Sequence, residues 1–192
     1  MKNQKVYLRV GINGSGHTRF IQDLERILGL KCFSKSSRTP LKTFHRRSTK
    51  FEKAIGLYEG KKMVAFDNTP VKQMCNLRTF KNLNGGSLTC NSTRNGIDTW
   101  VFSVNQSGMN SSGDIDADDI LVHVFGKDEL YGGRNLFYKN ITEVHHMLAD
   151  GTVRVLACDG KKLEDAIVLS YNECIKRVVG IHTHPTHHTA LN

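Results

Sequence analysis

A glycine-rich turn near the start of the chain has the residue types that bind phosphate. It reads Gly11-Ile12-Asn13-Gly14-Ser15-Gly16-His17-Thr18 and lies between an apolar run and a helical pattern. The pattern, G-x-x-x-x-G-H-T, differs by one residue from the phosphate-binding pattern G-x-x-x-x-G-K-[ST]. Glycines allow main-chain N–H groups to surround a phosphate, and the start of the following helix adds further donors. We therefore predict a phosphate site, with the Thr18 hydroxyl on Mg²⁺, formed by Gly11, Asn13, Gly14, Ser15, Gly16, His17, Thr18 and Arg19.

The position that usually carries a lysine is His17. An imidazole is shorter than a lysine side chain and mostly neutral at pH 7, so it is a poor substitute for an ammonium group near the outer phosphates. Two sources could supply the missing positive charge: Arg19, or the stretch 31–50, which has seven Lys and Arg residues and no acid. The alternative interpretation of this stretch is a solvated basic surface helix.

Histidines form a second set of residues that could bind a metal or take part in a reaction. His182 and His184 would project to one face of an extended segment, which suits Zn²⁺ or Ni²⁺, and Cys158 and Cys174 could complete such a site if the fold brought them near. A solvated tail is the simpler interpretation of residues 181–192. The segment 143–146, Glu-Val-His-His, faintly resembles an HNH-type nuclease, although such a pair of histidines is more often structural.

The spacing of apolar residues predicts the elements that would position the turn. Continuously apolar runs separated by helices favour a mostly parallel sheet covered on both faces, in an α/β domain. We expect strands at 6–10, 30–33, 63–66, 99–104, 120–125 and 153–158. We expect helices at 18–28 and 163–178, and a helix-permissive segment at 40–57.

Length and composition fit a single domain with an anionic partner. The chain has 192 residues, of which 39% are hydrophobic, and 27 Lys and Arg face 18 Asp and Glu, which gives a net charge of +9. This excess indicates a nucleotide or a nucleic acid as partner. No apolar run is long enough to span a membrane, and five scattered cysteines without a C-x-x-C pair favour a cytoplasmic protein with reduced thiols. We expect one nucleotide-binding domain over 1–180, with a lid-like polar loop region at about 78–113, and a histidine-rich tail over 181–192.

Taken together, the order of elements resembles a P-loop nucleotide kinase of the nucleoside-monophosphate or thymidylate-kinase type. The strand, turn and helix over 6–28 resemble the phosphate-binding unit of that family, and the segment 153–167 resembles its last strand and C-terminal helix. The resemblance implies a three-layer fold, ATP with Mg²⁺, and phosphoryl transfer. Asp67 resembles the acidic residue at the end of the family's third strand and would hold Mg²⁺ with Thr18. Arg46, Arg47, Arg78 or Arg94 would neutralise the transferred phosphoryl group.

Four other interpretations of the sequence remain open. The turn also resembles a Rossmann dinucleotide fingerprint, but the third glycine position holds Arg19 and no acidic residue lies near position 34. The turn could equally bind no ligand at all. A nucleic-acid-binding protein of the same fold would use the stretch 31–50 on phosphates and stack bases on Phe44, Phe80 and Trp100. A metal-dependent nuclease would use the histidine clusters.

Overall fold

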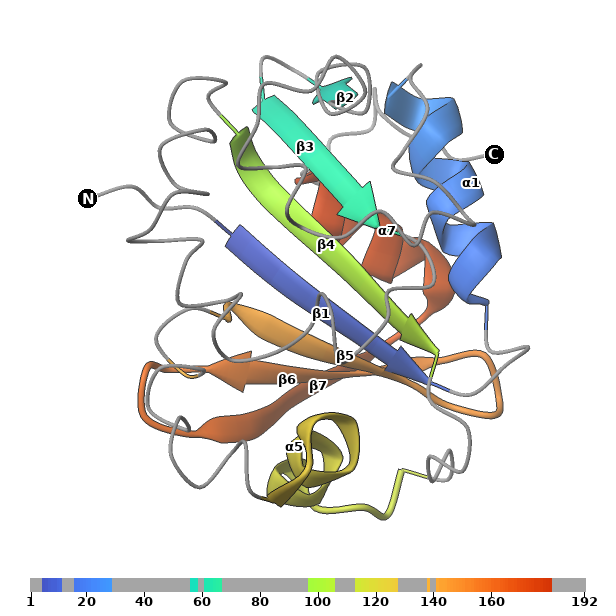
Figure 1. Cartoon of the computed structure of the whole chain (residues 1–192). Helices are drawn as coiled ribbons and strands as arrows, with labels where there is room; N and C mark the ends of the chain where they lie inside the picture. The colour runs from blue at the N-terminus through green and yellow to red at the C-terminus, as the bar shows by residue number, and fades with distance from the viewer. Residues whose placement is uncertain are drawn as a thin grey trace.

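The structure is a computed structural model that describes residues 5–11, 16–28, 56–58, 61–66, 97–105, 113–127, 138 and 141–180. These residues form an α/β fold around a seven-stranded mixed sheet with the strand order β2-β3-β4-β1-β5-β6-β7 (Figure 1). The strands are β1 (Lys5–Gly11), β2 (Gly56–Tyr58), β3 (Lys61–Phe66), β4 (Ile97–Asn105), β5 (Glu143–Met147), β6 (Val153–Cys158) and β7 (Leu163–Leu169). The helices are α1 (His17–Leu28), α5 (Ala117–Phe125) and α7 (Tyr171–Val179).

The direction of the strands changes across the sheet. The central strands β3, β4, β1 and β5 are parallel neighbours. At the two sides, β2 pairs antiparallel with β3, and β6 pairs antiparallel with both β5 and β7. The α/β class is confirmed, whereas the expected mostly parallel sheet is replaced by a mixed one.

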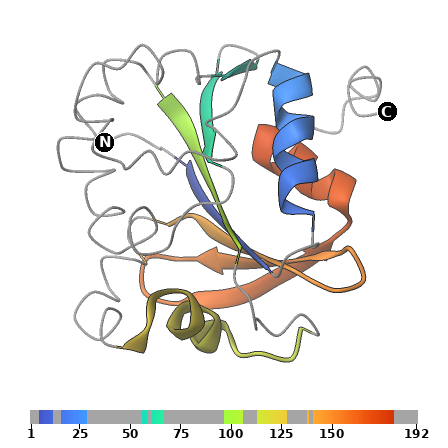
Figure 2. The same cartoon turned by 45° about the vertical axis from the view of Figure 1, so that its right-hand side comes forward.

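Side chains that alternate along β1 enter two separate cores. Val6, Leu8 and Val10 pack with α5 residues on one face, and Tyr7 packs with α1 and α7 residues on the other face. Figure 2 shows α1 and α7 side by side, with α5 on the opposite side of the sheet. Both faces of β1 are therefore buried, which explains why the strand is almost continuously apolar.

Five of the predicted elements are confirmed, one with the predicted boundaries and four extended by one to three residues in all. They are the strands at 6–10, 63–66, 99–104 and 153–158 and the helix at 18–28. In α1 the residues Phe20, Ile21, Leu24 and Leu28 are buried on one side, as a helical spacing of three and four requires.

The prediction of a strand at 120–125 was wrong, because this segment forms α5. The preceding acidic residues belong to the helix: Asp118 and Asp119 lie in its first turn, where a carboxylate interacts favourably with the helix dipole. Ile120, Leu121 and Val124 are buried on one side of α5. The apolar run alone could not distinguish a strand from a buried helix.

The prediction of one helix over 163–178 was also wrong, because this segment contains β7 followed by α7. Ser170 separates the two: its backbone is extended, and its side chain accepts a hydrogen bond of 3.2 Å from the Glu173 N–H. Serine followed three residues later by glutamate is a helix-start signal that the sequence contained. Upstream, Asp159 accepts bonds of 2.9 Å from the N–H groups of Lys161 and Lys162, which forms the turn between β6 and β7.

Several other predictions lie outside the described residues. They concern the strand at 30–33, most of the segment 40–57, the basic stretch 31–50, most of the polar region 78–113 and the tail 181–192. β2 and β5 had not been predicted. None of the described helices has both the length and the apolar character that crossing a membrane would require.

Candidate functional site

The predicted phosphate-binding turn begins at the carboxyl end of the central strand. β1 ends at Gly11, and α1 begins at His17 after Gly16, whose φ of +99° favours glycine. The first helical hydrogen bond runs from the Phe20 N–H to the Gly16 carbonyl at 3.0 Å. The N–H groups of residues 17–19 precede that bond and so have no acceptor within the helix. Asn13, Gly14 and Ser15 lie outside the described residues.

His17 is buried and serves the fold. Its Nε2 lies 3.1 Å from the Gly11 carbonyl oxygen and its Nδ1 lies 2.6 Å from Ser103 Oγ. A carbonyl can only accept, so Nε2 carries the proton and Nδ1 accepts the Ser103 hydroxyl proton. Burial lowers the pKa of His17 to about 4, even though the bond to Gly11 opposes the shift. A neutral His17 therefore joins the start of α1 to the ends of β1 and β4, and it does not replace the missing lysine.

Thr18 and Arg19 are exposed on the first turn of α1. The Arg19 guanidinium lies 4.1 Å from the centre of the Tyr171 ring, and its Nε lies 4.0 Å from the Asp23 carboxylate. The Tyr171 hydroxyl in turn donates to Asp23, so these side chains connect α1 with α7. The predicted Mg²⁺ ligand Thr18 is thus accessible, whereas Arg19 takes part in helix packing.

The remaining predicted site residues, Asp67, Arg46, Arg78 and Arg94, lie outside the described residues, as do Arg47, Phe44 and Phe80. Trp100 had been suggested as a base-stacking residue and cannot act as one, because it is completely buried in the core beneath α5.

The carboxyl ends of β1 and β4 lie where the chain continues to opposite faces of the sheet. After β1 the chain continues to α1 on one face, and after β4 the next described helix is α5 on the other face. In open α/β sheets, ligands bind where neighbouring connections leave to opposite faces. The same order disfavours the dinucleotide alternative: β1 lies between β4 and β5, whereas the Rossmann order places the second strand beside the first.

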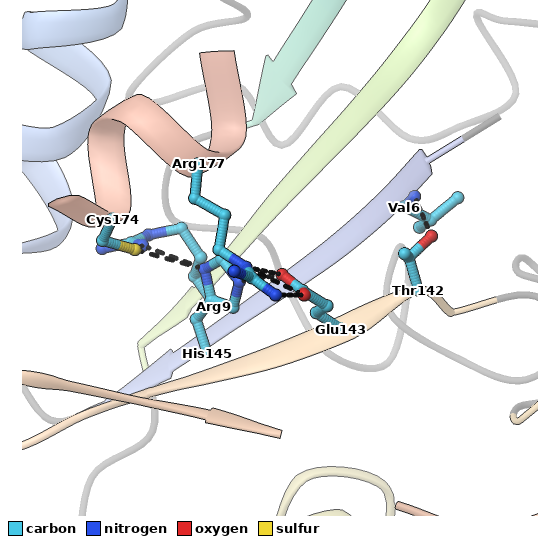
Figure 3. A network of polar contacts seen from close by, with 7 residues as sticks. All are labelled: Val6, Arg9, Thr142, Glu143, His145, Cys174 and Arg177. Atoms are coloured by element: carbon cyan, nitrogen blue, oxygen red, sulfur yellow. Dashed lines mark hydrogen bonds and ion pairs between the residues drawn. The ribbon is translucent and has the colours of Figure 1, made fainter. Parts of the chain in front are cut away.

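A second arrangement of polar side chains lies between the sheet and α7, and its members are buried except for Arg177, whose side chain is 40% exposed. We call it the Arg9 cluster; it comprises Arg9, Glu143, His145, Cys174 and Arg177 (Figure 3). Arg9 Nη1 donates to Cys174 Sγ at 3.1 Å and lies 3.4 Å from His145 Nδ1. His145 Nε2 lies 2.9 Å from Glu143 Oε1, and Arg177 Nη2 closes the cluster on Glu143 Oε2 at 2.5 Å. In the sheet, Arg9 lies directly between Ser103 of β4 and His145 of β5.

The electrostatics of the cluster differ from those around His17. Burial alone would raise the pKa of Glu143, but its hydrogen bonds to His145 and Arg177 outweigh burial and lower the pKa to about 2. Burial would lower the pKa of His145, but contacts with Cys174 and Glu143 raise it. For Cys174, burial is outweighed by the Arg9 charge and by the His145 hydrogen bond, so its pKa falls to about 7. The contacts within the cluster therefore favour the charged forms of Glu143, His145 and Cys174.

The sequence contained a weak signal of the Arg9 cluster. A charged residue in the middle of the apolar run Val6-Tyr7-Leu8-Arg9-Val10 requires a buried partner. Glu143 and His145 are two residues apart, a spacing that places both on one side of a strand. The HNH-type interpretation of this segment is not supported, because both His145 and His146 are buried within β5.

No metal site is found in the part of the chain that the structure describes, since no three of its His, Cys, Asp and Glu side chains gather around one point. Cys158 packs against the core beneath α5, and Cys174 belongs to the core on the opposite face. The suggested metal site with the C-terminal histidines required these two cysteines to lie close together. The fold instead places them on opposite faces of the sheet.

A pocket lies at the opposite ends of the same strands, that is, at the amino ends of β1 and β4. Its lining includes Lys5, Tyr7, Asp98, Thr99 and Arg177, together with residues 178–180 at the end of α7. Burial and the neighbouring Glu143 raise the pKa of Tyr7, so its hydroxyl stays protonated. The Arg9 cluster thus lies between this pocket and the carboxyl ends of β1 and β4, where the phosphate site is predicted.

Comparison of the chain with known protein families, with curated proteins and with solved structures gave no match.

Proposed function

We propose that this protein binds a nucleotide at the carboxyl ends of β1 and β4 and acts as a kinase-like phosphotransferase with an altered phosphate loop. The observation that carries the proposal is the position of the glycine turn. In the chain it follows the central parallel strand and precedes α1, and after β1 and β4 the next described helices cover opposite faces of the sheet, which supports the proposal. Main-chain N–H groups of the turn and of residues 17–19 would hold the phosphates.

In this proposal, the positive charge comes from segments other than the described sheet and helices. The described residues include 12 Lys and Arg and 13 Asp and Glu, a net charge of −1, so the rest of the chain has 15 Lys and Arg against 5 Asp and Glu, a net charge of +10. Arg46, Arg47, Arg78 and Arg94 are all in that part. Such residues would neutralise a transferred phosphoryl group, since this reaction depends mainly on positioning and charge stabilisation.

The proposed cofactor is ATP with Mg²⁺. Thr18 is exposed on the first turn of α1, where a hydroxyl could reach a metal bound to the phosphates. Because β3 runs parallel to β4, the carboxyl ends of both strands point the same way, and Asp67 is the next residue in the chain after β3 ends at Phe66. Thr18 and Asp67 are therefore the proposed metal ligands.

The test is calorimetric titration of the protein with ATP, GTP and nucleoside monophosphates, with and without Mg²⁺. Substitution Gly16→Ala should weaken binding about tenfold, since a left-handed backbone costs a non-glycine residue roughly 1–2 kcal/mol and the turn would rearrange. Gly160→Ala is the matched control: Gly160 also has a positive φ, of +91°, and open space at its Cβ, but it lies in the β6–β7 turn. Absence of binding at millimolar nucleotide, or equal losses for both variants, would contradict the proposal.

Binding of nucleic acid is the second candidate, and it is favoured by the concentration of positive charge outside the described core. It predicts that affinity for single-stranded RNA or DNA falls steeply with salt, because each phosphate contact releases a counterion. Nucleotide binding in an enclosed site would depend far less on salt. Titrations with ATP and with an oligonucleotide at two salt concentrations distinguish the two functions.

A further inference from the structure

The buried Arg9 guanidinium requires a negative charge, and its surroundings restrict where that charge can be. Arg9 is 1% exposed, and its guanidinium carries a positive charge. Its contacts are Cys174 Sγ at 3.1 Å, Met147 Sδ at 3.1 Å, His145 Nδ1 at 3.4 Å and the Phe20 ring at 3.4 Å. Its Nε has no hydrogen-bond partner among the described residues.

Among these contacts, Cys174 alone can become an anion. The carboxylate of the Arg9 cluster, Glu143, is already bound by His145 and by Arg177. An isolated buried cation is strongly unfavourable, and a paired one is much less so. The arrangement therefore favours a thiolate at Cys174 over a thiol.

We propose that Cys174 is an oxidisable nucleophile, held as a thiolate by Arg9 and supplied with a proton by His145, and that its substrate is hydrogen peroxide. The geometry is that of an activated thiol: Sγ lies 3.4 Å from His145 Nδ1, and the opposite ring nitrogen is oriented by Glu143. Cys174 is also in the first turns of α7, where its N–H bonds to the Ser170 carbonyl, so the positive end of the helix dipole is nearby.

The reaction balances with the groups present. The thiolate electron pair attacks one oxygen of the peroxide, forming an S–O bond and breaking the O–O bond. The leaving hydroxide takes the Nδ1 proton of the His145 imidazolium and becomes water. Cys174 is oxidised to a sulfenic acid, the peroxide is reduced, and His145 is left neutral.

Burial of the thiol determines the class of substrate. Cys174 is completely buried, which excludes bulky reagents, but Val178, one turn further along α7, lines the pocket at the amino ends of β1 and β4. Tyr7 and Arg177 line the same pocket and contact His145 and Glu143 respectively. This pocket holds roughly 140 Å³ of free space, and in the proposal hydrogen peroxide, which is small and uncharged, reaches Cys174 from it.

The chain contains its own comparison residue, Cys158. Cys158 is more exposed than Cys174, yet burial and the neighbouring Asp159 raise its pKa to about 12. Exposure alone would make Cys158 the more reactive cysteine, whereas thiolate character favours Cys174.

The experiment is a short pulse of hydrogen peroxide on the folded full-length chain, stopped with catalase. The protein is then unfolded in dimedone, which traps sulfenic acids, and each cysteine is quantified by peptide mass spectrometry. We expect Cys174 to be labelled at least about tenfold faster than Cys158, with a half-maximal rate near pH 7. The same pulse on the urea-unfolded chain should label the two cysteines at similar rates.

Two variants identify the cause of the reactivity. Arg9→Leu should slow labelling of Cys174 about tenfold, and Arg9→Lys should keep most of it, because the counter-charge is retained. If Arg9→Leu fails to fold, the pH profile of the unmodified protein still tests the proposal. Labelling of Cys174 no faster than that of Cys158, or a half-maximal rate above pH 8.5, would overturn it.

Discussion

Two histidines are buried on the face of the sheet that α1 and α7 cover, and their surroundings differ. His17 lies at the carboxyl ends of β1 and β4, between the Gly11 carbonyl and the Ser103 hydroxyl. His145 lies inside the Arg9 cluster, between the Glu143 carboxylate and the Cys174 sulfur. The first environment lowers the pKa of the imidazole and the second raises it. Burial is common to both, so the partners determine the charge.

The difference also separates two uses of a buried polar side chain. Around His17, neutral hydrogen bonds hold a helix start against two strand ends. Around His145, charged groups compensate one another over several side chains, and the removal of one leaves the others unpaired. The same chemical group is therefore a connector in one region and part of a reactive cluster in the other.

The largest expected effect comes from replacing each histidine by phenylalanine. His145→Phe should lower the free energy of unfolding by about 3–5 kcal/mol, because Glu143 and Cys174 lose a buried partner. His17→Phe should cost about 1–3 kcal/mol, because only neutral hydrogen bonds are lost. Urea unfolding followed by the fluorescence of Trp100, the single tryptophan, measures both. Equal losses would mean that the two environments do not differ in charge.

The next effect is a dependence of stability on acid. Since the pKa of His17 is lowered from 6.5 to about 4, its neutral form is stabilising above pH 6.5, and this contribution is lost as the pH falls towards 4. The loss is on the order of 3 kcal/mol by linkage. His145, with a raised pKa, loses no stabilisation in this range, because its contribution is complete below 6.5.

As the pH is lowered from 6.5 to 4, the free energy of unfolding should therefore fall in the original protein. In His17→Gln it should stay nearly constant over the same range. Glutamine keeps a donor for the Gly11 carbonyl and does not titrate. An unchanged slope in His17→Gln would assign the acid sensitivity to another group.

The smallest expected effect concerns Ser103. Ser103→Ala removes the hydroxyl that donates to His17 Nδ1 and should cost about 1 kcal/mol. In the His17→Phe background the same change should cost much less, because the partner is already absent. A double-mutant cycle with a coupling energy near zero would show that this hydrogen bond contributes nothing to stability.

The sequence was sufficient for elements whose patterns are local. The buried strand β1 and the amphipathic helix α1 follow from the spacing of their apolar residues. It was insufficient where a short apolar run fits two structures: residues 120–125 became helical because an acidic first turn precedes them, and residues 163–169 became a strand because β6 offered an antiparallel partner.

The candidate sites divide in the same way. The glycine-rich turn after β1 could be singled out because its residues are contiguous, and its binding of phosphate stays a prediction. The Arg9 cluster could not, because Arg9 is 136 positions from His145 and 165 positions from Cys174, and only the sheet and α7 bring them together. The neutral state of His17 likewise depended on Ser103, which lies 86 positions away.

The direct lateral alignment of Ser103, Arg9 and His145 across three strands has one more consequence. Neighbouring strands lie about 4.8 Å apart, so the two histidine environments are separated by only about two strand spacings, with a permanent cation midway. The Arg9 charge lowers the proton affinity of both imidazoles. An anion that binds near His17, or a negative charge that is lost near His145, therefore changes the free energy of protonation of both imidazoles.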